Sequence, residues 1–275
     1  MDIYNMYSFN GVLMLKSVYT PLSGAIAQER VLEIIANNLA NATTVGFKGE
    51  NVSFKLLDPE PEKHYIDPLP PANYKIPFEE ILPLRGNEVS YVGVSGVSRD
   101  LSQGSPIETK NSLDFMIEGE GYFAVNTKEG VRYTRNGSFT LSQDGALVDK
   151  SGSPILGEKG NIFLNGSQIK VNGIGEVYQD GELVDRIAIT KIKNSKQMEK
   201  VGMNYFLHTG LEGDIEIDKF PVVRQGYLEG SNVNAIKNLT DMIIAHRSYE
   251  AYQQAIKNYD SMMEKSNNTI GEVRA

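Results

Sequence analysis

Two stretches of this chain, near residues 15–41 and 231–268, carry apolar side chains at helical spacing, and they lie at its opposite ends. The residues between them are rich in Gly, in Asn-Gly and Asp-Gly pairs, and in short strand-like runs. A long helix with one apolar face needs a partner to cover that face. This layout predicts two terminal helices that pack against each other or against neighbouring copies of the chain.

The first stretch places an apolar residue every three or four positions, at Leu22, Leu32, Ile35 and Leu39 among others. Pro21 lies early in it and predicts an irregular first turn. Short amide side chains, ending with Asn41, compete for backbone hydrogen bonds and weaken the far end. Gly46 then permits a turn with positive φ. We therefore expect the helix to end near residue 41 and the chain to bend at Gly46.

The last stretch repeats apolar residues every seven positions, in two series offset by three. Ile236 and Leu239 fill its start, and the repeated positions are Met242, Tyr249, Ile256 and Met263, then Ala245, Tyr252 and Tyr259. Such a heptad repeat is typical of a coiled-coil seam.

The middle of the chain divides into two parts. Residues 50–85 hold seven of the 11 prolines without a sustained period, which predicts an extended linker. Residues 86–228 carry turn signals at 136–137, 144–145, 165–166 and 180–181, as in a domain of β-hairpins. The predicted class is α+β. A mainly-β central domain, built as a hairpin-rich barrel or sandwich, is flanked by long terminal helices that pair as a coiled coil. The helical domain is discontinuous, at 1–49 plus 229–275.

Composition excludes several function classes. The net charge of −8 disfavours nucleic acid as a partner. The absence of Cys removes disulfides, zinc–thiolate sites and Cys nucleophiles. No apolar run approaches the roughly 18 residues of a membrane span, so we expect no direct membrane insertion. The first residues lack the basic start of a signal peptide, so we expect any export to proceed without a cleaved signal. Met14 is an alternative to Met1 as the first residue of the protein.

No residue set predicts catalysis, a cofactor or a metal site. His64, His208 and His246 stand far apart, without the spacing of a metal site. Asp114, Glu118 and Glu120 are interpreted as solvated hairpin edges rather than as a catalytic carboxylate pair. We therefore expect a protein that is not an enzyme.

Several motifs in order resemble the bacterial flagellar rod and hook protein family. At the N-terminal end these are SGA at 23–25 and ANNLANATTVGFK at 36–48. GYF at 121–123 and YTRNGSF at 133–139 follow, then QGYLEGSNVN at 225–234 and MIIAHRSYE at 242–250. Within the family, GSPILG at 152–157 and LEGSNV at 228–233 look most like the proximal-rod member, with the distal-rod or hook-like axial subunit as the alternative.

The resemblance implies an axial structural polymer of the flagellar basal body, in the periplasmic rod, that transmits torque from motor to hook. Its partners would be copies of itself, other rod subunits, neighbouring hook–basal-body proteins and the flagellar type III export apparatus. The terminal helices would form the assembly interface. Residues 41–48 would join inner helix to outer domain, with Asn41 at the start, Gly46 at the bend and Phe47 in an apolar pocket.

Two other classes stay open from the residues alone. A secreted β-rich adhesin with coiled-coil oligomerisation arms would form a closed oligomer of fixed number, whereas head-to-tail contacts that do not close give an open filament. A carbohydrate-active enzyme would need a cleft with a titratable pair.

Overall fold

The computed structural model describes residues 3–57, 91–165, 168–194, 197–202 and 204–272. These fall into two compact units. Unit 1 holds the N-terminal helix up to residue 36, residues 50–57 and 91–98, and the C-terminal helix from residue 236. Unit 2 holds residues 37–49 and the strand-rich remainder between 99 and 235. Two terminal helices therefore flank a strand-rich middle, which confirms the predicted α+β class.

Both terminal helices are long. They are α1, Ile3–Ala40, and α3, Ala235–Glu272, each of 38 residues. Helix α1 begins well before the predicted stripe and continues through Pro21, so the predicted irregular first turn is wrong. A proline removes only one backbone donor, and the turns on either side keep their own bonds. In this stretch the Ser23 hydroxyl also donates to the Thr20 carbonyl, at 2.8 Å.

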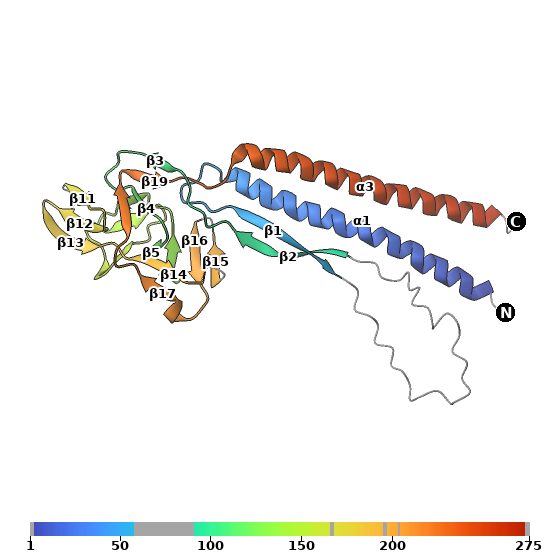
Figure 1. The fold of residues 1–275 in the computed structure, drawn as a ribbon, viewed down its shortest axis with the longest axis horizontal. Helices are drawn as coiled ribbons and strands as arrows, with labels where there is room; N and C mark the ends of the chain where they lie inside the picture. The colour runs from blue at the N-terminus through green and yellow to red at the C-terminus, as the bar shows by residue number, and fades with distance from the viewer. Residues whose placement is uncertain (1–2, 58–90, 166–167, 195–196, 203, 273–275) are drawn as a thin grey trace, which may run out of the picture. The chain divides into compact units, whose positions relative to one another are not determined.

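Within unit 1, α1 and α3 run alongside each other in opposite directions (Figure 1). Gly24 marks their approach, because a Cβ added there would lie 2.6 Å from the Tyr252 ring. Strands β1, Glu50–Leu57, and β2, Tyr91–Arg99, pair in the same unit. The Val92 amide donates to Ser23 Oγ, at 3.4 Å. Residues 50–57 of the predicted linker are thus a paired strand, and residues 58–85 lie outside the described residues. The predicted domain boundaries stay a prediction.

The strands of unit 2 are short and join mainly through turns. They are β3 (Pro106–Glu108), β4 (Phe115–Glu118), β5 (Tyr122–Thr127), β6 (Gly130–Thr134), β7 (Phe139–Leu141), β8 (Leu147–Asp149), β9 (Leu156–Gly157), β10 (Gly160–Asn161), β11 (Ile169–Val171), β12 (Glu176–Gln179), β13 (Glu182–Arg186), β14 (Ile189–Ile192), β15 (Met198–Val201), β16 (Tyr205–His208), β17 (Ile215–Ile217), β18 (Val222–Gln225) and β19 (Tyr227–Glu229). A short 3₁₀ helix, Glu212–Asp214, precedes β17.

The largest sheet is antiparallel and orders its strands β15-β16-β6-β5-β14-β17. Strand β5 is buried on both faces. Phe123 and Val125 join the main apolar core, whereas Tyr122 and Ala124 join a second cluster with Phe206. Because the sheet ends at β15 and β17, the described strands form no closed barrel, and that alternative is wrong.

Smaller sheets surround this one, in the orders β11-β12-β13, β9-β10, β7-β8, β4-β18 and β3-β19. Asp180 and Gly181 link β12 to β13 with φ of 52° and 90°, as the Asp-Gly signal predicts for a two-residue hairpin turn. The pairs β4-β18 and β3-β19 bring the C-terminal end of the β region back to its beginning. Glu229 is the last residue of β19 and pairs with Pro106, the first residue of β3.

Candidate functional site

Residues 46–49 and 229–232 are held together by backbone hydrogen bonds, and we call these two segments the terminal joint. The Gly46 amide donates to the Glu229 carbonyl at 2.7 Å. The Gly49 amide donates to Asn232 Oδ1 at 2.8 Å, and the Asn232 amide donates to the Phe47 carbonyl. Two motifs from opposite ends of the sequence thus meet inside unit 2.

Gly46 forms the predicted bend. Its φ is +68°, which residues with a side chain rarely adopt. A Cβ there would also lie 2.5 Å from the backbone nitrogen of Asn136. Glycine is therefore required twice at this position, by the turn and by the close approach of a second segment.

A buried ion cluster of Lys48, Arg135 and Glu229 fills the joint. The Glu229 carboxylate accepts from Lys48 Nζ at 2.6 Å and from Arg135 Nη1 at 3.3 Å. The side chains of Lys48 and Glu229 are 1% exposed and that of Arg135 is 6% exposed. Charged groups this deep are stable only when paired, because the unpaired ion loses its hydration without compensation.

Further contacts fix each member of the buried ion cluster. Lys48 Nζ also donates to the Ser102 carbonyl at 2.6 Å, and Arg135 Nη2 donates to the Gly119 carbonyl at 2.7 Å. Burial lowers the pKa of Lys48 below its ordinary value of 10.5, and the adjacent Glu229 carboxylate opposes that shift.

Phe47 is fully buried beside this cluster, and Lys200 Nζ lies 4.3 Å from the centre of its ring. That geometry is a cation–π contact. Phe47 packs within its own chain, and its role in assembly stays a prediction.

Three family models match this chain. "Flagella basal body rod protein" matches residues 19–48, "Flagellar hook protein FlgE/F/G D1 domain" matches 116–185, and "Flagellar basal body rod FlgEFG protein C-terminal" matches 224–269. The flagellar basal-body rod protein FlgF of Rhizobium meliloti (strain 1021) is 30% identical over 267 residues, covering 95% of this chain and 100% of the relative. The chain belongs to the flagellar basal-body rod protein family.

Other rod proteins are similar to a comparable degree. FlgG of Buchnera aphidicola subsp. Acyrthosiphon pisum is 33% identical over 267 residues, covering 92% of this chain and 98% of the relative. FlgG of Bacillus subtilis (strain 168) is 28% identical over 267 residues, covering 92% and 98%. The buried ion cluster takes one residue from each segment that the three models match: Lys48, Arg135 and Glu229.

The rod protein also presents apolar side chains on the outer faces of both terminal helices. On α1, Tyr19, Leu22 and Ile26 follow each other at spacings of three and four and are exposed, Ile26 by 57%. On α3, Ile236, Leu239, Ile243 and Ile244 are exposed, Ile236 by 79%. Each helix therefore carries a stripe of exposed apolar side chains.

The remaining predicted interface residues are less accessible. Ile35 is buried; Leu32, Leu39, Met242, Tyr249, Tyr252, Ile256 and Met263 are half-buried, and Tyr259 is at the border of exposure. Asn41 is half-buried, and its side-chain amide donates to the Asn37 carbonyl at 2.8 Å. Thus the heptad positions of α3 lie largely on its covered side, whereas the residues at its start lie on the open side. Their role between subunits stays a prediction.

The sequence patterns did not predict the buried ion cluster of the terminal joint. Lys48, Arg135 and Glu229 each lie in a motif quoted for the resemblance, but nothing local marks them as buried. The available signal is a charged residue inside a run of Gly and apolar residues. Asp114 was also misread, because it is buried and accepts from Asn111 Nδ2 at 3.2 Å, whereas Glu118 and Glu120 are exposed.

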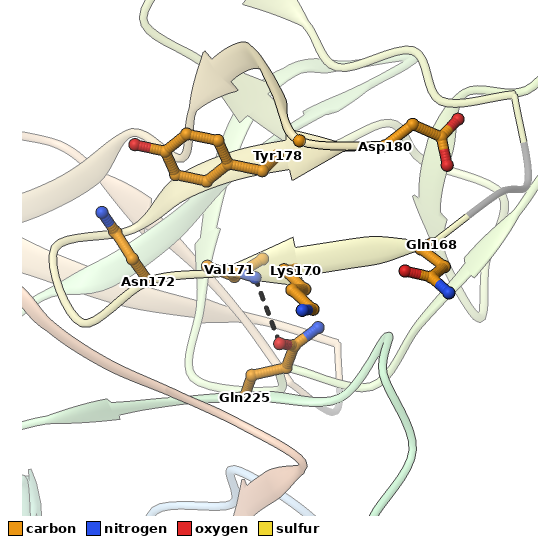
Figure 2. Close-up of a pocket in the computed structure, with 8 residues that line it drawn as sticks. Gln168, Lys170, Val171, Asn172, Tyr178, Asp180 and Gln225 are labelled. Atoms are coloured by element: carbon orange, nitrogen blue, oxygen red, sulfur yellow. Dashed lines mark hydrogen bonds between the residues drawn. The ribbon is translucent and has the colours of Figure 1, made fainter.

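Unit 2 carries a groove of about 740 Å³ on strands β11 and β12 (Figure 2). Three of its polar side chains, those of Asn172, Tyr178 and Gln225, are hydrogen-bonded. Gln225 Oε1 accepts from the Val171 amide at 3.1 Å, and the Tyr178 hydroxyl donates to Glu176 Oε2 at 2.8 Å. Among the described residues, no group of three His, Cys, Asp or Glu side chains could hold a metal ion. No described helix is long and apolar enough to span a membrane.

Proposed function

We propose that this protein is a structural subunit of the proximal part of the flagellar rod, that it polymerises helically through its terminal helices, and that it transmits torque from motor to hook. The observation that carries the proposal is the similarity to rod proteins over at least nine-tenths of the chain. The relatives bear the names FlgF and FlgG at similar identity, and the distal rod is the alternative position.

The helix pair supplies the physical basis. The close approach of Gly24 to Tyr252 supports an antiparallel coiled coil of α1 and α3, with heptad residues such as Tyr252 and Ile256 in its seam. Pairing within one chain leaves Ile26 and Ile236 on outer faces. Those faces are then available to the helices of neighbouring copies.

A heterologous contact repeats along a filament when its rotation does not close into a ring. The terminal stripes of one rod subunit would contact different stripes on the next, and each added copy would cover apolar surface left by the one before. The terminal joint would transmit force from these helices to unit 2, because the buried ion cluster connects the segments that follow α1 and precede α3. Partners beyond the same chain would be other rod subunits and neighbouring hook–basal-body proteins, and export would use the flagellar type III apparatus.

Substituting Ile236 tests the assembly surface without disturbing the core, because that side chain is 79% exposed in the single chain. Cells that lack the gene are complemented with wild type, Ile236→Asp or Gln253→Asp, and their basal bodies are examined by electron microscopy. Gln253 is an exposed polar residue of the same helix and is the matched control.

We expect Ile236→Asp to leave the rod missing or truncated and to abolish motility, while Gln253→Asp restores both. A break close to the motor would support the proximal position, and a break nearer the hook would support the distal one. Complete rods and normal swimming with Ile236→Asp would contradict assembly through this face, and complete rods in cells without the gene would contradict the rod function itself.

A further inference from the structure

A second cavity of unit 2, about 450 Å³ in volume, lies directly beside the buried ion cluster. Arg135 contributes to both, since its guanidinium binds Glu229 and also lines this cavity. The Nε of Arg135 is buried and has no hydrogen-bond partner among the described residues. A buried N–H donor without an acceptor is costly, so the hydrogen-bonding capacity of the Arg135 guanidinium is not fully used within the chain.

The charges of the buried ion cluster point the same way. Lys48 and Arg135 are two cations, and Glu229 is the one buried carboxylate that pairs with them, whereas Asp100 acts on Lys48 from an exposed position. One positive charge is therefore left over among side chains that are at most 6% exposed. In surroundings of low polarity, an anion close to Arg135 would offset this surplus.

The cavity wall defines the class of that anion. Lys191 and Lys193 add two cations, but Asp218 and Glu216 pair with them at 2.8 Å and 3.4 Å. Exposed Glu120 adds a further negative charge to the wall. Since these carboxylates would repel a multiply charged ligand, the site favours a monoanion.

Two other features of the wall favour an organic anion. Leu101, Ile192 and Met198 line it and would pack against a short carbon chain. Tyr122 lines it too, with Arg135 stacked 5.1 Å from its ring centre. Its hydroxyl is a second hydrogen-bond donor, and burial raises its pKa, so it stays protonated at neutral pH.

We propose that this cavity is a binding site for a carboxylate group on a short aliphatic chain, held by the Arg135 guanidinium with the Tyr122 hydroxyl. The carboxylate comes from an Asp or Glu side chain of a second copy, or from a small organic acid. The chain holds 35 Asp and Glu residues, so acidic side chains are plentiful at contacts between copies. In contrast, the groove in Figure 2 lies on other strands of unit 2 and does not include Arg135, so it serves as the control surface.

The test uses the full chain labelled with ¹³C in its methionine methyl groups, because Met198 lines the cavity. The Met198 signal is identified by its loss in Met198→Leu. Sodium butyrate is titrated as the probe, and butyramide is its neutral analogue of the same shape. We expect a saturable shift of the Met198 methyl signal with butyrate, at a dissociation constant of about 1 mM, and no saturable shift with butyramide.

Three variants locate the binding group. Arg135→Lys keeps the charge but removes the planar guanidinium, and Lys193→Gln removes an exposed cation. We expect butyrate to bind at least about tenfold more weakly to the first and about twofold to fivefold more weakly to the second. Lys170→Gln, in the groove of Figure 2, should bind butyrate as the wild type does.

Sedimentation of the wild type with and without butyrate separates the two sources. Weaker self-association in butyrate identifies the carboxylate as a side chain of a second copy, and unchanged self-association identifies a small acid. The proposal is overturned if butyramide shifts Met198 as butyrate does, or if butyrate produces no saturable shift. It also fails if neither Arg135→Lys nor Lys193→Gln weakens binding. None of these outcomes depends on whether the protein is found in the rod.

Discussion

Replacing Glu229 by Gln should destabilise unit 2 far more than loss of one ordinary charge would. The substitution keeps the shape of the side chain but leaves Lys48 and Arg135 buried as cations without a carboxylate. Removing one member of a buried ion pair typically costs about 3–5 kcal/mol, because the remaining charge stays unhydrated and unpaired. Here one carboxylate serves two cations, so we expect a loss at the upper end of that range.

Urea unfolding of the full-length protein measures this loss. The chain has no Trp but has 14 Tyr, so tyrosine fluorescence and far-ultraviolet circular dichroism are suitable signals. With a slope of about 2 kcal/mol per molar urea, a loss of about 4 kcal/mol lowers the unfolding midpoint by about 2 M.

Glu216→Gln is the matched control, because Glu216 pairs with Lys193 in the same unit with both side chains more than 60% exposed. That change should alter the free energy of unfolding by less than about 1 kcal/mol. Adding Lys48→Met to Glu229→Gln should cost less than Lys48→Met costs alone, since it removes a stranded cation. If Glu229→Gln and Glu216→Gln lowered stability equally, the buried ion cluster would not hold the terminal joint.

Three further changes test other contacts. Gly24→Ala places a methyl group against the Tyr252 ring and should lower the free energy of unfolding by about 1–3 kcal/mol. Tyr252→Ala should reduce that penalty, and thermal melts of both single variants and the double variant would check this. An additive result would contradict the contact between the helices. Gly46→Ala should lower the free energy of unfolding in urea by at least about 1 kcal/mol, because alanine is strained at a φ of +68° and its Cβ would clash with the backbone of Asn136. An unchanged free energy of unfolding would refute the bend. Burial, and then the hydrogen bond to Asp149, raises the pKa of Tyr205 above 10.0. The stability that the protonated Tyr205 contributes is complete below pH 10.0 and is lost as the pH rises. The wild type should therefore lose stability above pH 10 more steeply than Tyr205→Phe, and parallel pH profiles would count against that hydrogen bond.

Local sequence patterns were sufficient for the elements whose stability is local. The heptad repeat predicted α3, and the Asp180-Gly181 pair predicted the turn between β12 and β13. Gly46 was predicted to bend the chain because few other residues adopt positive φ. These features depend on side-chain spacing and on backbone conformations available to single residues.

Local sequence patterns predicted the structure less well where burial or helix continuity depends on the rest of an element and its neighbours. Pro21 predicted an irregular first turn, but α1 continues through it, because a helix of 38 residues retains its hydrogen bonds on either side. Strand β5 is buried on both faces, since an apolar cluster lies on each side of it. Whether a strand is at an edge or central depends on its neighbours and not on its own residues.

The sequence by itself determined two terminal helices with apolar stripes, a β-rich middle and the bend at Gly46. Only the tertiary structure decided which charges are buried, because Lys48 and Glu229 are 181 residues apart and Arg135 comes from a third segment. The same holds for the cavity beside Arg135. A charged residue is exposed or buried according to what surrounds it. Those surroundings exist only after the β4-β18 and β3-β19 pairs have brought distant segments together.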